Sequence, residues 1–225
     1  MAALLNAAKR IEAVIFDMDG LLVDTETLAM RALMSAAANM DLDLPEKLCH
    51  LMIGVPAEHS RYMLQNHFGY DFCVESFLEI VDLHMTGAIN AGCLRLKAGV
   101  LQLLACLEDW RMAKAVATSS SRNKAMRHLG ATQISDRFDA IITRDDVERG
   151  KPHPDLFLRT ADELGFPPGR CLVLEDSYNG VRAAHGAGTK VVMVPDILPP
   201  TDEMRSKCVM IAANLHAVPS ILSNR

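Results

Sequence analysis

Short runs of consecutive apolar residues alternate with longer amphipathic segments along most of this chain. The first run, Ala13–Phe16, contains Val, Ile and Phe in succession and is followed by a glycine turn. Such continuous apolar runs are typical of strands that are buried on both faces. The pattern predicts further strands over Lys114–Thr118, Ala140–Thr143, Cys171–Glu175 and Lys190–Val194, with a weaker one over Val209–Ile211.

Helical segments separate these strands in the second half of the chain. The predicted helices are Val100–Trp110, Arg122–Leu129, Pro154–Leu164 and Asn179–Ala187, followed by a closing helix near the end. Pro154 suits the first turn of a helix, where its missing N–H is not needed. Strands that alternate with helices build a parallel sheet covered on both faces. The sequence therefore predicts an α/β fold with a doubly wound parallel sheet.

The segment between the first strand and Arg95 contains no strand-like run. Its predicted helices are Thr25–Asn39, Pro45–Leu51, Ala57–Phe68 and Cys73–Ala91, separated by Pro, Gly or Asp. We therefore expect residues 21–95 to form a small helical domain. It would be inserted into a core made of residues 1–20 and 96–225.

The composition argues against several classes of protein. Of the 225 residues 50% are hydrophobic, and the net charge of −5 argues against a nucleic-acid or anionic-membrane surface. No apolar run approaches the roughly 18 residues of a membrane span, and residues 1–10 do not form a signal-peptide pattern. The six cysteines include no CxxC pair, which favours reduced thiols in a cytoplasmic protein. We expect a monomer by default.

Polar side chains follow four of the predicted strands. They are Asp17 and Asp19 after the first, Thr118, Ser119 and Ser120 after the second, Lys151 after the third, and Glu175 and Asp176 after the fourth. In an open parallel sheet, ligands bind beyond the carboxyl ends of the strands. An acidic pair, hydroxyls, a lysine and a second acidic pair would therefore meet at one edge of the sheet.

Each of these groups also has an ordinary structural explanation. Asp-Gly commonly forms a turn, a Thr-Ser cluster commonly caps a helix, and a loop lysine is commonly solvated. Glu175 and Asp176 would complement the dipole of the following helix. Their convergence on one edge favours phosphoryl transfer, which uses oxygen ligands for Mg²⁺, donors for phosphate oxygens and a carboxylate nucleophile.

Other motifs with similar residues do not fit. An EF-hand also begins Asp-x-Asp, but Leu21 occupies its fifth position and a strand precedes it. Gly150-Lys151 lacks the remaining residues of a phosphate-binding P-loop, and Gly186-Ala187-Gly188 lacks the third glycine of a dinucleotide fingerprint. The histidines show no metal-binding spacing, so zinc is not expected.

In order and spacing, the motifs resemble those of the haloacid-dehalogenase superfamily of phosphatases and phosphomutases. The matching segments are Phe16–Glu26, Thr118–Ser120, Gly150–Asp155 and Leu174–Val181. The helical insert looks like the small α-helical cap of the subgroup that contains β-phosphoglucomutase and many sugar-phosphate and nucleotide phosphatases. The resemblance implies a Rossmann-like catalytic core with a cap inserted after the first strand.

The resemblance also implies a role for each acidic residue. Asp17 would attack phosphorus and form an aspartyl-phosphate, whereas Asp19 would protonate the leaving oxygen and then activate water. Mg²⁺ would be bound by Asp17, by the backbone carbonyl of Asp19 and by Asp176. Glu175 would be either a direct ligand or a neighbour of the direct ligands.

Substrate-binding candidates come from both predicted domains. They are Thr118, Ser119, Lys151, Thr25 and His59. Thr118 and Lys151 would hold phosphate oxygens, with Ser119 as the alternative to Thr118. In the insert, residues near Gly54, Val55 and His59 would select the leaving group.

Three functions on this fold differ in what they require. The first is a Mg²⁺-dependent phosphatase acting on a sugar phosphate or nucleoside monophosphate. A β-phosphoglucomutase-type phosphomutase needs a cation on the cap. This sequence has Ala57 and Ala29 where such mutases carry arginine and histidine, although Arg61 lies one helical turn beyond Ala57. A non-catalytic binding module would be expected to lack part of the acidic and basic set, which is complete here.

Overall fold

The computed structural model describes residues 11–52 and 57–222. These residues form two compact units. One comprises the chain up to Val23 together with the chain from Leu96 onward, and the other comprises Asp24–Arg95. The positions expected to select the leaving group, Gly54 and Val55, lie outside the described residues.

A six-stranded parallel sheet forms the centre of the first unit. Its strands are β1 (Ala13–Phe16), β2 (Ala113–Ala117), β3 (Ala140–Ile142), β4 (Cys171–Glu175), β5 (Lys190–Met193) and β6 (Met210–Ile211). Their order across the sheet is β3-β2-β1-β4-β5-β6, and every pairing is parallel. β1 lies in the middle of the sheet. From β1, the chain first adds β2 and β3 outward on one side and then β4, β5 and β6 outward on the other side.

The register of the central strands aligns their carboxyl ends. Phe16 at the end of β1 lies opposite Val116 of β2 on one side and Leu174 of β4 on the other. All four side chains of β1 are fully buried, as expected for a strand covered on both faces. The residues that directly follow these three strands are therefore brought together at one edge.

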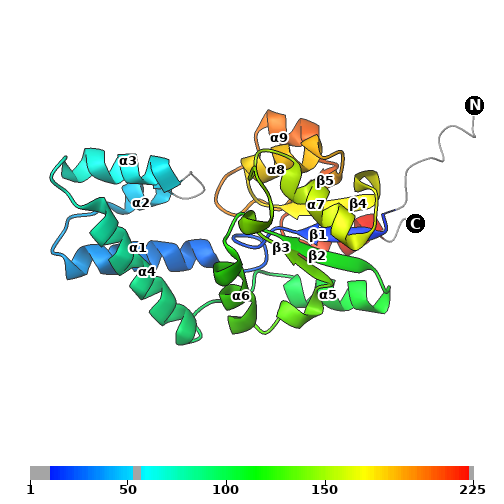
Figure 1. The fold of residues 1–225 in the computed structure, drawn as a ribbon, viewed down its shortest axis with the longest axis horizontal. Coiled ribbons are helices and arrows are strands. Elements are labelled where there is room, and N and C mark those ends of the chain that lie inside the picture. The colour runs from blue at the N-terminus through cyan, green and yellow to red at the C-terminus, as the bar shows by residue number, and fades with distance from the viewer. Residues whose placement is uncertain (1–10, 53–56, 223–225) are drawn as a thin grey trace, which may run out of the picture. The chain divides into compact units, whose positions relative to one another are not determined.

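Helices cover both faces of the sheet (Figure 1), with α7 and α8 on one side and α5 and α6 on the other. Their bounds are Val100–Asp109 for α5, Arg122–Ala131 for α6, Asp155–Leu164 for α7 and Tyr178–Gly186 for α8. Alternate strand residues, including Ile15 and Val173, pack with Phe157 of α7 and Val181 of α8 in one apolar cluster. Burial of this cluster fixes the helices that carry the loops of the carboxyl edge.

Helices are the only regular elements among the described residues of the second unit. It consists of α1 (Thr25–Asn39), α2 (Glu46–Met52), α3 (Ala57–Phe68) and α4 (Val74–Asn90). Its own core includes Leu33 of α1, Leu64 of α3 and Phe77 of α4. This apolar cluster gives the unit a core of its own, separate from that of the sheet.

The predicted α/β fold with a doubly wound parallel sheet is confirmed, with several bounds displaced by one or two residues. The pattern missed α9 (Asp202–Lys207), a polar helix of six residues that Thr201 caps. Such a helix is too short to show an amphipathic period. The remaining short elements are α10 (Pro219–Leu222) and the 3-10 turns Ser135–Arg137, Arg144–Asp146, Pro168–Arg170 and Leu215–Ala217.

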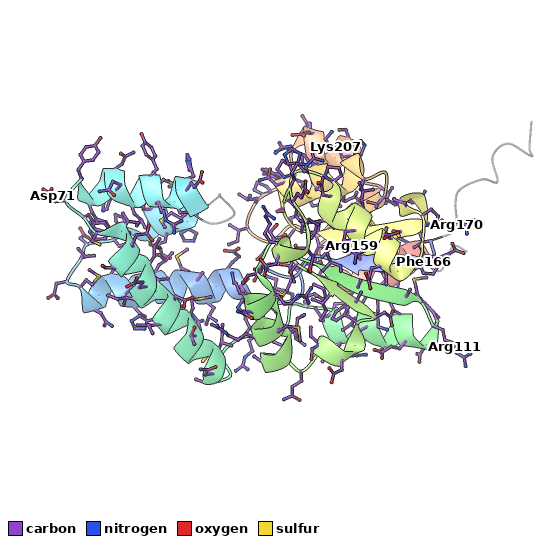
Figure 2. All side chains as sticks on the ribbon, in the orientation of Figure 1. Asp71, Arg111, Arg159, Phe166, Arg170 and Lys207 are labelled. Atoms are coloured by element: carbon purple, nitrogen blue, oxygen red, sulfur yellow. The ribbon has the colours of Figure 1, made fainter. Side chains whose placement is uncertain are left out.

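Charged residues lie at the opposite edge of the sheet, where the strands have their amino ends. Arg111 and Arg170, labelled in Figure 2, lie just before β2 and β4. Arg170 forms an ion pair with Glu12 at 2.7 Å beside the start of β1. This exposed pair contributes little to stability. No helix among the described residues is both long and apolar enough to cross a bilayer.

Candidate active site

The carboxyl ends of β1, β2 and β4 bring the predicted motifs together. Asp17 follows β1 directly, and its backbone N–H donates to the carbonyl of Leu174 in β4 at 3.0 Å. Thr118 follows β2, and its N–H donates to the carbonyl of Ile142 at 3.0 Å. Because both residues extend the hydrogen-bonding pattern of the sheet, their positions are set by its rigid centre.

Lys151 connects all three of these strands through its ammonium group. Its Nζ donates to a carboxylate oxygen of Asp17, to Oε1 of Glu175 at 2.6 Å and to the carbonyl of Ala117 at 3.1 Å. It also lies 5.0 Å from the centre of the Phe157 ring. Only 5% of the lysine side chain is exposed, so these interactions take place away from bulk water. Lys151 therefore holds the two carboxylates in fixed positions.

Both oxygens of Glu175 are occupied. Oε1 accepts from Lys151, and Oε2 accepts from the N–H groups of Asp176 and Ser177 and from the Ser177 hydroxyl, at 3.0 to 3.1 Å. The side chain is fully buried. A carboxylate bound in this way is well suited to orient Lys151, because its hydrogen bonds fix its own direction.

The site contains more negative than positive charge. Burial raises the pKa of Asp17 to about 8, and the nearby carboxylates of Glu175 and Asp19 add to this effect while Lys151 opposes it. Burial lowers the pKa of Lys151, but the charges of Asp17 and Glu175 outweigh burial and raise it above its ordinary value. Lys151 is therefore charged, and the surplus carboxylate charge favours a further cation.

Asp19 lies in the loop after β1, with polar groups around its carboxylate. Its Oδ2 accepts from the Ser120 hydroxyl at 2.7 Å, and its Oδ1 lies 3.2 Å from Nδ1 of His128. Burial raises the pKa of Asp19, but His128, Lys124 and Ser120 outweigh it and hold the pKa well below its usual range. In this arrangement Asp19 is ionised.

The donor set of the site fits a hard divalent cation. Oxygens of Asp17, Glu175 and Asp176 lie within 4.8 Å of one another. Carboxylate oxygens are the ligands that Mg²⁺ prefers, and the surplus negative charge described above would be offset by it. Since Glu175 already uses both oxygens, Asp17 and Asp176 are the carboxylates best placed to hold the ion directly.

Gly20 lets the loop after β1 pass close to Asp176. Its φ is +82°, in the left-handed region, and a Cβ at this position would lie 2.3 Å from Oδ2 of Asp176. Any larger residue would displace that carboxylate. The turn chemistry of the Asp-x-Asp-Gly motif is therefore needed for the second acidic pair to approach the first.

The hydroxyl cluster divides into three different positions. Thr118 is buried, and its Oγ1 accepts from the N–H of Ser120 at 3.0 Å. Ser119 is exposed, and Ser120 contacts Asp19. Burial at the strand end favours Thr118 over Ser119 as the hydroxyl of the site, which remains a prediction.

Two further candidates belong to the helical unit. Thr25 is the first residue of α1, and His59 is an exposed residue of α3. Their contact with substrate stays a prediction.

Sequence reasoning missed two side-chain roles at the site. The contact of His128 with Asp19 was not anticipated, because a histidine within a helical segment carries no motif. The sequence shows Ser120 only as part of a serine run and does not predict its hydrogen bond to Asp19. Both interactions join residues about a hundred positions apart. A polar residue at an apolar helical position is the one signal that could have indicated His128.

The chain is similar to known proteins over most of its length. Residues 14–194 match the family model described as haloacid dehalogenase-like hydrolase. The chain is 32% identical to the phosphorylated carbohydrates phosphatase of Thermotoga maritima over 79% of this chain and 82% of the relative. It is 31% identical to hexitol phosphatase B of Escherichia coli over 85% of this chain and 86% of the relative.

A solved structure has the same fold. The Thermotoga maritima protein described as a "putative beta-phosphoglucomutase" superposes with a TM-score of 0.83 at 28% identity. The superposition covers 95% of this chain and 99% of that one.

Glu175, which accepts a hydrogen bond from Lys151, packs closely against α8. This packing can be tested by substitution. A Cβ at Gly180 would lie 1.8 Å from Cδ of Glu175, whereas one at Gly186 of the same helix would meet Pro154 at 3.8 Å. We expect Gly180→Ala to lower the free energy of unfolding by about 3 kcal/mol, because Glu175 must move out of its bonds. We expect Gly186→Ala to be neutral or to stabilise by up to about 1 kcal/mol.

Urea unfolding of the two variants would measure this difference. Equal stability of Gly180→Ala and Gly186→Ala would contradict the tight packing of Glu175 against α8.

Proposed function

This chain belongs to the haloacid dehalogenase-like hydrolase family, and we propose that it is a Mg²⁺-dependent phosphatase of small phosphorylated metabolites. Its family and its relatives named as phosphatases make it a phosphoric monoester hydrolase. The observation that carries the finer proposal is the buried Lys151 bridging Asp17 and Glu175 at the carboxyl edge of the sheet. This edge is where open parallel sheets bind their ligands.

Asp17 is the proposed nucleophile. One carboxylate oxygen would form a bond to phosphorus while the bond from phosphorus to the leaving oxygen breaks, giving an aspartyl-phosphate. Lys151 supports this step because its ammonium group contacts Asp17 and would also attract the phosphate oxygens. Water would then attack the same phosphorus, releasing phosphate and restoring the carboxylate.

Asp19 is the proposed proton carrier in both steps. It would give a proton to the leaving oxygen in the first and take one from water in the second. Its depressed pKa keeps it ionised, as the second task requires, although it also makes the carboxylate a weak base. For the first task, the negative phosphoryl group itself would raise the pKa of Asp19, since like charges disfavour ionisation.

Mg²⁺ would be held by the carboxylates of Asp17 and Asp176 and by the backbone carbonyl of Asp19. When bound, the ion would neutralise charge on the phosphoryl group during transfer. Glu175 would act through Lys151, since both of its oxygens are already engaged.

The substrate proposal is a sugar phosphate or a nucleoside monophosphate. The relatives named phosphorylated carbohydrates phosphatase and hexitol phosphatase support a phosphorylated carbohydrate. Thr118 would bind a phosphate oxygen, and the helical unit would act as a cap that selects the leaving group through residues such as Thr25 and His59. Cytoplasmic localisation and a monomeric state complete the proposal and rest on the sequence.

The alternative is a β-phosphoglucomutase-type phosphomutase, which the description of the similar Thermotoga structure favours. A mutase must grip a second phosphate. Arg61, the cation that could do this, already pairs with Glu75 through Nε at 2.8 Å and through a second nitrogen at 3.4 Å. Its charge is therefore partly offset, which supports hydrolysis over isomerisation.

We expect the purified protein to release phosphate from at least one sugar phosphate or nucleoside monophosphate when Mg²⁺ is present. Release should stop with EDTA and return with added Mg²⁺, because the carboxylate cluster repels phosphate without a cation. Asp17→Asn should abolish turnover, since an amide does not replace the nucleophile. A colorimetric phosphate assay across a substrate panel measures all three outcomes.

The matched control is Asp71→Asn, which changes an exposed aspartate of the helical unit (Figure 2) in the same way. It should retain wild-type turnover. Turnover by folded Asp17→Asn at a rate similar to that of the control would refute the mechanism.

The choice between hydrolysis and isomerisation has its own test. We expect no conversion of β-glucose 1-phosphate into glucose 6-phosphate, even with a bisphosphate primer, because Ala57 and Ala29 stand where such mutases carry arginine and histidine. In addition, Arg61 already contacts Glu75. A coupled glucose 6-phosphate assay measures the conversion. Primer-dependent conversion that is lost in Arg61→Ala would establish the mutase instead.

A further inference from the structure

A buried histidine on α6 faces the loop after β1. His128 is almost fully buried, on the same helix as the buried residues Ala125 and Leu129. An apolar residue at such a position would pack without leaving polar atoms to satisfy. A histidine there costs free energy unless its ring nitrogens are used.

Nδ1 of the His128 ring has one candidate hydrogen-bond partner in the described part of the chain. This nitrogen lies 3.2 Å from Oδ1 of Asp19. Both atoms are buried, and neither has another hydrogen-bond partner among the residues that the structure describes. The separation is that of a hydrogen bond, although its alignment falls short of a well-formed one. Hydrogen bonds of catalytic groups are often loose in this way before substrate binds.

The two oxygens of Asp19 have different surroundings. Oδ1 is buried beside His128, whereas Oδ2 accepts from the Ser120 hydroxyl. The side chain as a whole keeps 22% of its surface exposed. Since Oδ1 is closed off, Oδ2 is the oxygen left for proton exchange with a bound ester or water.

We propose that His128 is a positioning residue, whose Nδ1–H donates to Oδ1 of Asp19 and so directs Oδ2 towards the reacting phosphate ester. The proposal deepens the phosphatase function above and rests on it. Contacts at both oxygens restrict rotation of the carboxylate. A group held in this way transfers its proton without first being reoriented.

This role makes a prediction that depends on the leaving group. A sugar alkoxide is a strong base and must be protonated as it leaves, so its release needs a correctly placed Asp19. The p-nitrophenolate ion is a weak base and leaves without that proton. Loss of the His128 contact should therefore lower kcat/KM for a sugar phosphate and leave kcat/KM for p-nitrophenyl phosphate nearly unchanged, because kcat/KM reports the first step, in which the leaving group departs.

Two polar substitutions distinguish the position of the N–H donor from the mere presence of a polar side chain. His128→Asn keeps an N–H donor close to the place of Nδ1, whereas His128→Gln puts its amide near the place of Nε2. For the sugar phosphate that the wild type hydrolyses fastest, we expect His128→Gln to lower kcat/KM about 10²-fold. We expect His128→Asn to stay within about 10-fold of the wild type, and p-nitrophenyl phosphate to change less than about 3-fold in both.

A double-mutant cycle completes the test. In an Asp19→Asn background, His128→Gln should cause no further loss with the sugar phosphate, because the contact no longer has a carboxylate to position. Equal losses for both esters, equal effects of Asn and Gln, or full additivity with Asp19→Asn would overturn the positioning role while the phosphatase function stands. Failure of the wild type to hydrolyse either ester would overturn the phosphatase function itself, and the positioning role with it.

Discussion

The buried ammonium group of Lys151 is the interaction on which the site depends. It joins Asp17 after β1 to Glu175 at the end of β4, and its third hydrogen bond goes to the end of β2. Removing one partner of a buried ion pair leaves an uncompensated charge, which commonly costs about 3–5 kcal/mol. The three central strands are thus tied together at the edge where chemistry is proposed, by the same charges that the chemistry would use.

One cation does not balance this edge. Lys151 contacts Asp17 and Glu175, while Asp176 and Asp19 add two further carboxylates nearby. Burial raises the pKa of Asp17, and this surplus of carboxylates adds to the effect. Two features of the fold accommodate this surplus negative charge. Backbone N–H groups donate hydrogen bonds to Glu175, and the absence of a side chain at Gly20 leaves room for the carboxylate of Asp176. An edge prepared in this way is stable enough to fold and still attracts a divalent cation.

Much of the fold and the main acidic and basic residues could be predicted from the sequence. Ala13–Phe16 and the first four residues of Cys171–Glu175 are continuous apolar runs, whose short length indicates buried strands. The residues after them were expected at one edge because parallel strands align their carboxyl ends. The reversal of strand order around β1 is what brings the two acidic pairs side by side.

What the sequence did not predict depends on long-range side-chain geometry. The contacts of Asp19 with Ser120 and His128 require α6 to lie beside the loop after β1, which no local pattern specifies. The pairing of Arg61 with Glu75 likewise depends on how α3 and α4 pack. The packing of Glu175 against Gly180 is also invisible in the motif, since the glycine reads there only as part of a helix.

The central claim is that phosphoryl transfer proceeds through the carboxylate of Asp17. The most direct measurement uses Asp19→Asn, in which the water-dependent second step should be slowed, with an aryl phosphate whose departure needs no proton. After acid quench, peptide mass spectrometry should find one added phosphoryl group on the peptide that contains Asp17. A phosphoryl group on any other residue, or phosphate release at the rate of ester cleavage with no labelled enzyme, would contradict the account.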